Sequence, residues 1–115
     1  MSIVTLPIEF SDGLAMDATE ARALGEMLAQ DYKMAVPFPH TVMDGILPDQ
    51  LIQQILENFP TEAIGSDRNF NIGYGGQFKR QVMPEDCSAF NRNLFHFFNS
   101  RPVLQFLEGL TGIEG

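Results

Sequence analysis

The sequence predicts an α+β fold in which helices outnumber short strands that do not follow one another. Four segments carry apolar residues at helical spacing, and the stretches between them hold prolines, glycines and short β-branched runs. The chain has 115 residues, of which 44% are hydrophobic and ten are Phe. This length fits a single domain or fragment over residues 1–115, and the phenylalanines supply bulky side chains for its core.

The first two elements are a strand and a long helix. Residues 3–10 alternate loosely between apolar and polar types and predict a short strand, which a turn at residues 11–13 ends. Asp17 followed by Glu20 has the spacing of a helix-capping box. We therefore expect a helix to begin there and to end before Pro37, because proline cannot continue it.

A proline-rich stretch leads into the second helix. Thr41 to Met43 predict a short strand, which the Asp44–Gly45 turn closes. Pro48 suits the first turn of a helix. The apolar stripe of that helix consists of Leu51, Ile52, Ile55, Leu56 and Phe59.

The remaining elements are one strand and two helices. Residues 77–82 predict a strand after a polar loop. Phe90, Leu94, Phe97 and Phe98 then mark a helix. Ser100 is expected to cap a last helix with Pro102 in its first turn and an apolar side formed by Val103, Leu107 and Leu110.

The charge balance excludes some partners. Fifteen acidic against seven basic residues give a formal charge of −8. Such a surface repels phosphate backbones and anionic membranes, so neither nucleic acid nor a membrane is an expected partner. A single cysteine, Cys87, excludes an internal disulfide framework. With no signal-peptide pattern in the first ten residues, we expect a cytoplasmic protein.

Neither histidine forms a metal-binding pair. Iron oxygenases of the facial-triad type use two His and one carboxylate, and two of these commonly lie at positions i and i+2 of a strand. His40 is followed two residues later by Val42, and His96 by Phe98. We expect His40 to be hydrogen-bonded near a strand start and His96 to be partly buried on its helix. No catalytic, cofactor or metal residue is therefore assigned in this chain.

One basic pair is a candidate binding site. Lys79 and Arg80 adjoin each other in an otherwise acidic chain and could contact an anion or a carboxylate substrate. A solvated strand face is the alternative reading of the same pair. The glycines at 73, 75 and 76 lack the Lys-Ser/Thr ending of a phosphate loop and predict a turn.

Together, three segments resemble the prolyl 4-hydroxylase-like family of dioxygenases. Residues 37–48, with the sequence PFPHTVMDGILP, and the helix after them look like the opening of these enzymes. Residues 98–113, FNSRPVLQFLEGLTGI, are similar to the helix that precedes their catalytic barrel, and the basic strand at Lys79 and Arg80 lies between the two. The resemblance covers residues 34–113.

The resemblance implies the N-terminal support of a double-stranded β-helix (jelly-roll) enzyme that uses iron(II), oxygen and 2-oxoglutarate. In the family, the His-x-Asp pair, the distal His and the basic 2-oxoglutarate anchor follow the Thr-Gly-Ile stretch, so this chain would hold neither iron nor 2-oxoglutarate alone and would be inactive by itself. Its expected partner is the missing C-terminal barrel, or a second copy through exposed apolar surface. The alternatives are a non-catalytic protein-binding module on the same scaffold and an unrelated acidic protein.

Overall fold

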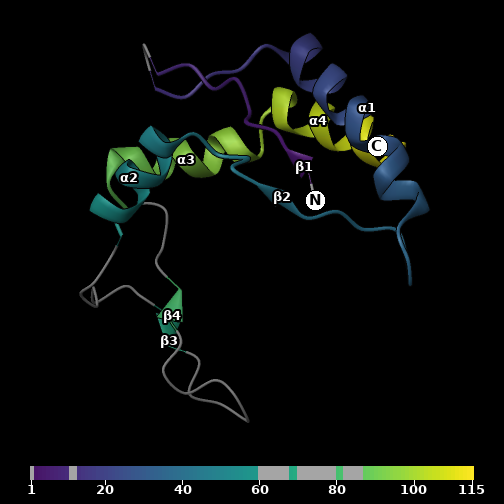
Figure 1. Ribbon diagram of the computed structural model, residues 1–115. Helices are drawn as coiled ribbons and strands as arrows, with labels where there is room; N and C mark the ends of the chain where they lie inside the picture. The colour runs from purple at the N-terminus through teal and green to yellow at the C-terminus, as the bar shows by residue number, and fades with distance from the viewer. Residues whose placement is uncertain (1, 11–12, 60–67, 70–79, 82–86) are drawn as a thin grey trace.

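The structure is a computed structural model that describes residues 2–10, 13–59, 68–69, 80–81 and 87–115, without the side chains of 2–3, 68–69 and 80–81. Figure 1 shows α1 beside α4 at one end of the molecule. The other end holds α2 and α3, which a hydrogen bond between Asn91 and Asn58 connects. The elements in chain order are β1 (Ser2–Ile3), α1 (Ala18–Met34), β2 (Met43–Asp44), α2 (Asp49–Glu57), β3 (Arg68–Asn69), β4 (Arg80–Gln81), α3 (Ala89–Phe98) and α4 (Arg101–Thr111).

Helix α1 has the start and the end that its sequence predicts. An Asp17 carboxylate oxygen accepts a hydrogen bond from the Glu20 amide at 2.8 Å, which satisfies one of the unpaired donors at the helix start. The helix ends at Met34 because Ala35 is extended, with φ −66° and ψ 144°, ahead of Pro37. Its buried side carries Ala21, Gly25 and Leu28.

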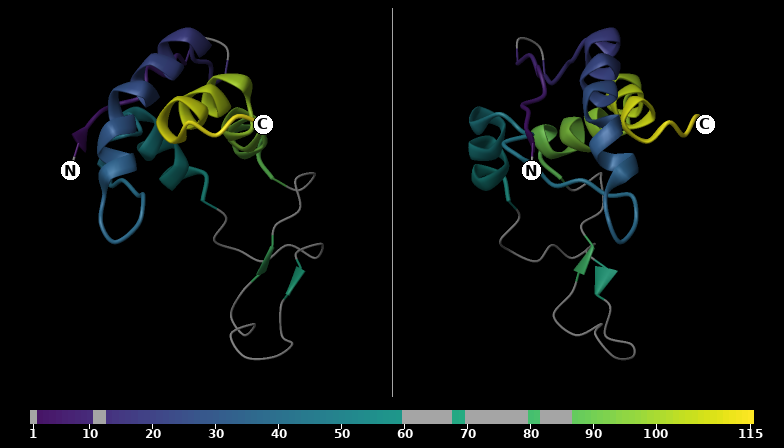
Figure 2. Two further views of the ribbon diagram at one scale, coloured as in Figure 1. Left: turned by 90° about the vertical axis from the view of Figure 1, so that its right-hand side faces the viewer. Right: turned by 45° about the vertical axis from the view of Figure 1, so that its right-hand side comes forward.

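Helices α1 and α4 approach each other closely. A Cβ atom on Gly25 would lie 2.8 Å from the Leu110 amide nitrogen, and one on Gly109 would lie 2.5 Å from the Arg22 carbonyl oxygen. Because glycine has no side chain, the two helix backbones can touch at both positions. Figure 2 shows the two helices side by side in both of its views.

Helices α2 and α3 are joined at their ends. Ser88 caps α3, and its hydroxyl oxygen accepts a hydrogen bond from the Asn91 amide at 3.1 Å. The Asn91 side-chain amide in turn donates to the Asn58 carbonyl oxygen at 3.0 Å. This bond satisfies a carbonyl at the C-terminus of α2 and holds that end against the start of α3.

The N-terminal strand is shorter than the predicted strand over residues 3–10. Only Ser2–Ile3 forms β1, which pairs in parallel with β2. The two segments remain hydrogen-bonded after the strands end, because the Leu6 amide donates to the Ile46 carbonyl oxygen at 2.8 Å. Glu9 then pairs with Ala15 in an isolated antiparallel bridge. Residues 2–6 therefore pair with residues 43–46, whereas Glu9 pairs with Ala15. This change of pairing partner ends the regular strand.

The predicted strand over residues 77–82 lies only partly within the described residues. Arg80–Gln81 forms β4, antiparallel to β3, with Asn69 opposite Arg80. Residues 77–79 and 82 lie outside the described residues. The second predicted strand, at residues 41–43, corresponds to β2 at Met43–Asp44, which begins two residues later.

The core lies where the N-terminal segment crosses the helices. Among the described residues no polar or charged side chain is buried. The core therefore gains its stability from apolar contacts alone. Its buried members are Leu6, Ile8, Met16, Ala21, Leu28, Leu51, Phe97, Val103, Phe106 and Leu110.

Candidate functional site

Of the predicted basic pair Lys79 and Arg80, the structure describes only the backbone of Arg80. Lys79 lies outside the described residues. Arg80 belongs to β4, where its backbone pairs with Asn69, and its side chain is not described. An anion or substrate contact by Lys79 and Arg80 therefore stays a prediction.

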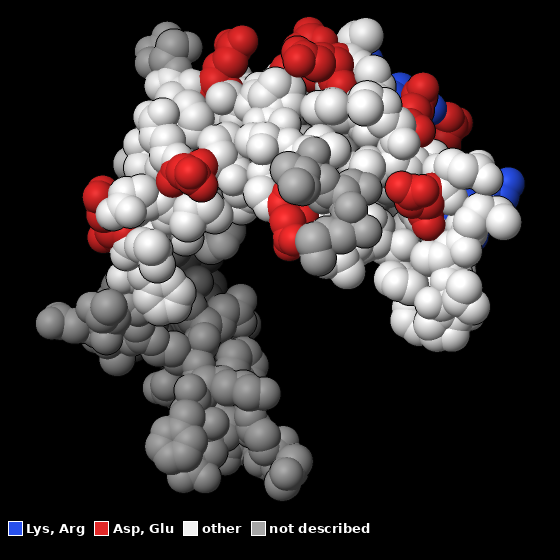
Figure 3. Space-filling view, in the orientation of Figure 1, with Lys and Arg blue, Asp and Glu red and all other residues white. Residues whose placement is uncertain are grey.

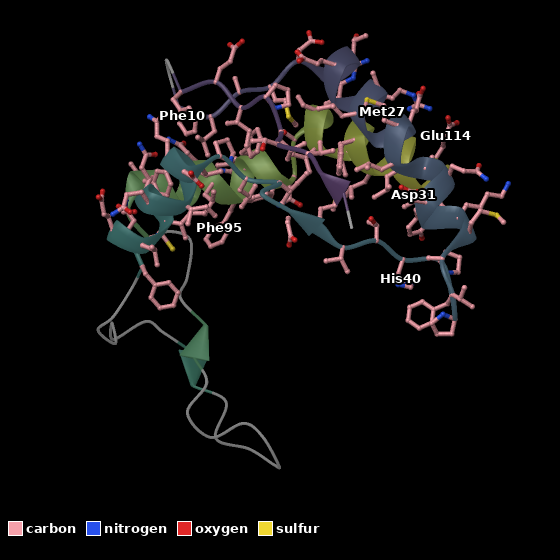
Figure 4. All side chains as sticks on the ribbon, in the orientation of Figure 1. Phe10, Met27, Asp31, His40, Phe95 and Glu114 are labelled. Atoms are coloured by element: carbon pink, nitrogen blue, oxygen red, sulfur yellow. The ribbon has the colours of Figure 1, made fainter. Side chains whose placement is uncertain are left out.

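His40 makes a local hydrogen bond near the start of β2, as expected. Its Nδ1 atom lies 2.7 Å from the Phe38 carbonyl oxygen. Because a carbonyl oxygen only accepts, this geometry requires a proton on Nδ1. The imidazole also packs edge-on against the Phe38 ring, with 5.4 Å between the ring centroids. These contacts fix the conformation of the proline-rich segment, which Figure 4 shows at the end of the molecule away from Phe95.

His96 is exposed on α3, so the prediction that it is partly buried was wrong. The Phe-rich sequence around it suggested burial, but on this helix Phe97 alone is fully covered, and residue 96 points to another side. His96 lines an open pocket with Asn93, Ser100 and Gly13.

The described residues do not form an iron site. Figure 1 places α3, which carries His96, and the segment that carries His40 at opposite ends of the molecule. In the part of the chain that the structure describes, no group of three His, Cys, Asp or Glu side chains is arranged to hold a metal ion. Such a site would need two His and a carboxylate around one point, and these residues do not supply it.

The largest of the described pockets lies between the C-terminal ends of α1 and α4. Its volume is about 420 Å³, and Tyr32, Lys33, Leu110 and Ile113 contribute to its lining. Both helix ends direct main-chain carbonyls toward this region, which disfavours an anionic ligand, while Lys33 disfavours a cationic one. The pocket therefore has no charge preference that would identify a ligand.

The most conspicuous surface feature is a second apolar face on α2. Leu51 is fully buried, whereas Ile52, Leu56 and Phe59 are 41%, 65% and 64% exposed. Their spacing predicts one stripe on a helix that reaches Phe59, but α2 ends at Glu57 and Phe59 follows the C-cap residue Asn58. A solvent-facing helix side is normally polar, so an apolar outer side is typical of a surface that another structure covers.

Helix α3 adds two phenylalanines to this exposed set. Phe95 is 51% and Phe98 is 38% exposed. Figure 4 shows Phe95 projecting from the lower side of α3. We call Ile52, Leu56, Phe59, Phe95 and Phe98 the α2–α3 surface. Periodicity alone could not have found it, because it identifies apolar sides without saying which of them is covered.

Charges on the visible face are mainly acidic. Figure 3 shows Asp and Glu side chains spread across the described part, whereas Lys and Arg atoms appear only toward the upper right, over α1. Arg22 of α1 is itself engaged, since it pairs with Glu26, Glu108 and Glu114 at 3.1, 3.5 and 3.2 Å. A partner that covered the α2–α3 surface would therefore meet acidic side chains nearby.

The comparisons with known proteins identify no relative: no protein-family model, curated protein or solved structure matches this chain. The resemblance to prolyl 4-hydroxylase-like dioxygenases accordingly stays a prediction. Within the described residues, no helix is long and apolar enough to cross a membrane.

Proposed function

We propose that this chain is the N-terminal support region of an iron(II)- and 2-oxoglutarate-dependent dioxygenase of the prolyl 4-hydroxylase-like kind. In this proposal, residues outside the chain supply the iron ligands, the 2-oxoglutarate anchor and the barrel. The region itself contributes a helical platform and no catalytic group. A cytoplasmic location belongs to the same proposal and is supported by the single cysteine and the acidic composition.

The observation that carries this proposal is the exposed α2–α3 surface. Exposed Leu56 lies on α2, and exposed Phe59 lies just after the end of this helix. Helix α2 directly follows the proline-rich segment 37–48, where the family resemblance is most detailed. A platform that supports a further domain needs such an uncovered apolar side. The short β1–β2 pair adds support, because a two-stranded sheet is marginally stable alone and is stabilised by further strands or by packing against a helix.

The coding sequence after the Gly115 codon tests the proposal first. We expect an open reading frame with a His-x-Asp pair followed by a more distant His. A stop codon directly after Gly115, or a frame without these residues, would rule the proposal out.

Two protein lengths then test the platform role. Amide hydrogen exchange is compared between residues 1–115 alone and the chain extended by the downstream frame. We expect the amides at residues 52–59 and 95–98 to gain protection only in the extended chain, which should also form succinate from 2-oxoglutarate when iron(II) is present. The amides around Gly25 serve as the internal control, because α4 already covers them.

A non-catalytic protein-binding module is the second candidate. The observation that favours it is the buried apolar cluster that the described residues form among themselves, from Leu6 to Leu110. A module should be monodisperse in solution and should unfold in one cooperative transition. The support-region proposal predicts instead that residues 1–115 self-associate. Analytical ultracentrifugation together with urea unfolding therefore separates the two candidates.

A further inference from the structure

We draw no further inference here: the strongest candidate, the α2–α3 surface formed by Ile52, Leu56, Phe59, Phe95 and Phe98, belongs to the site already described, and nothing in the structure shows what covers it.

Discussion

Gly25 of α1 and Gly109 of α4 lie where the two helix backbones touch, and each faces main-chain atoms of the other helix. The space for a Cβ atom on Gly25 is taken by the Phe106 carbonyl oxygen and the Leu110 amide, and the space on Gly109 by the Arg22 carbonyl oxygen. A glycine inside a helix costs about 1 kcal/mol relative to alanine. Here the two glycines permit a close crossing of α1 and α4, and Val103 and Phe106 of α4 are buried.

The first prediction concerns this crossing. We expect Gly25→Ala to destabilise the fold by about 2–3 kcal/mol, because the added methyl group forces the helices apart. The measurement is urea unfolding followed by circular dichroism. Ala23→Gly, at an exposed position of the same helix, is the matched control and should cost only about 1 kcal/mol. If Gly25→Ala stabilised the protein, as helix propensity alone predicts, this result would contradict the close approach of α1 and α4 at Gly25.

The second prediction separates the two apolar sides of α2. Leu51→Ala should lower the free energy of unfolding by about 2–5 kcal/mol, because Leu51 is fully buried and its truncation leaves a cavity. Leu56→Ala, five residues later, should change it by less than about 0.5 kcal/mol, because that side chain is largely exposed. Equal effects at the two positions would contradict the assignment of the inner and outer sides.

The third prediction concerns self-association. Replacing Leu56 and Phe59 by Ser should weaken association of residues 1–115 at least fivefold in sedimentation velocity, because less apolar surface is then available. The wild-type association should strengthen with salt, which screens repulsion between copies of charge −8. Met27→Ser, at an exposed position of α1 outside the α2–α3 surface, is the control and should leave association unchanged. Loss of association in that control would place the contact elsewhere.

The fourth prediction concerns Arg22. Its guanidinium also donates to the Gln105 side-chain oxygen at 2.9 Å, so one side chain connects α1 to α4 and to Glu114 after it. Because these groups are partly exposed, we expect Arg22→Gln to cost only about 1 kcal/mol, and less at high salt. Glu26→Gln removes only the contact within α1 and should cost less than half as much. An effect of Arg22→Gln that does not depend on salt would argue for packing rather than charge.

The fifth prediction tests the cap of α1. Asp17→Ala should destabilise the fold by about 1 kcal/mol, because the Glu20 amide loses its acceptor. Asp17→Asn should retain most of the stability, since the asparagine side-chain oxygen caps almost as well. Thermal unfolding of the two variants at the same pH distinguishes them, and equal losses would show that the charge of Asp17 matters more than the hydrogen bond.

The local environment of the two histidines could be predicted only in part. For His40, a hydrogen bond near the start of a strand was predicted and is present, but only the structure identified the Phe38 carbonyl as its partner. His96 depended on how α3 is turned relative to its neighbours, which the Phe-rich sequence does not specify.

The sequence by itself determined the helices and most of their ends. Prolines, the Asp17 cap and apolar residues at helical spacing act within a few residues of each other, so their effects do not depend on the rest of the fold. Only the tertiary structure decided that Leu51 is buried and Leu56 exposed, and that Gly25 lies against the backbone of α4. Both outcomes depend on how helices distant in the sequence pack together, and helical spacing does not encode that arrangement.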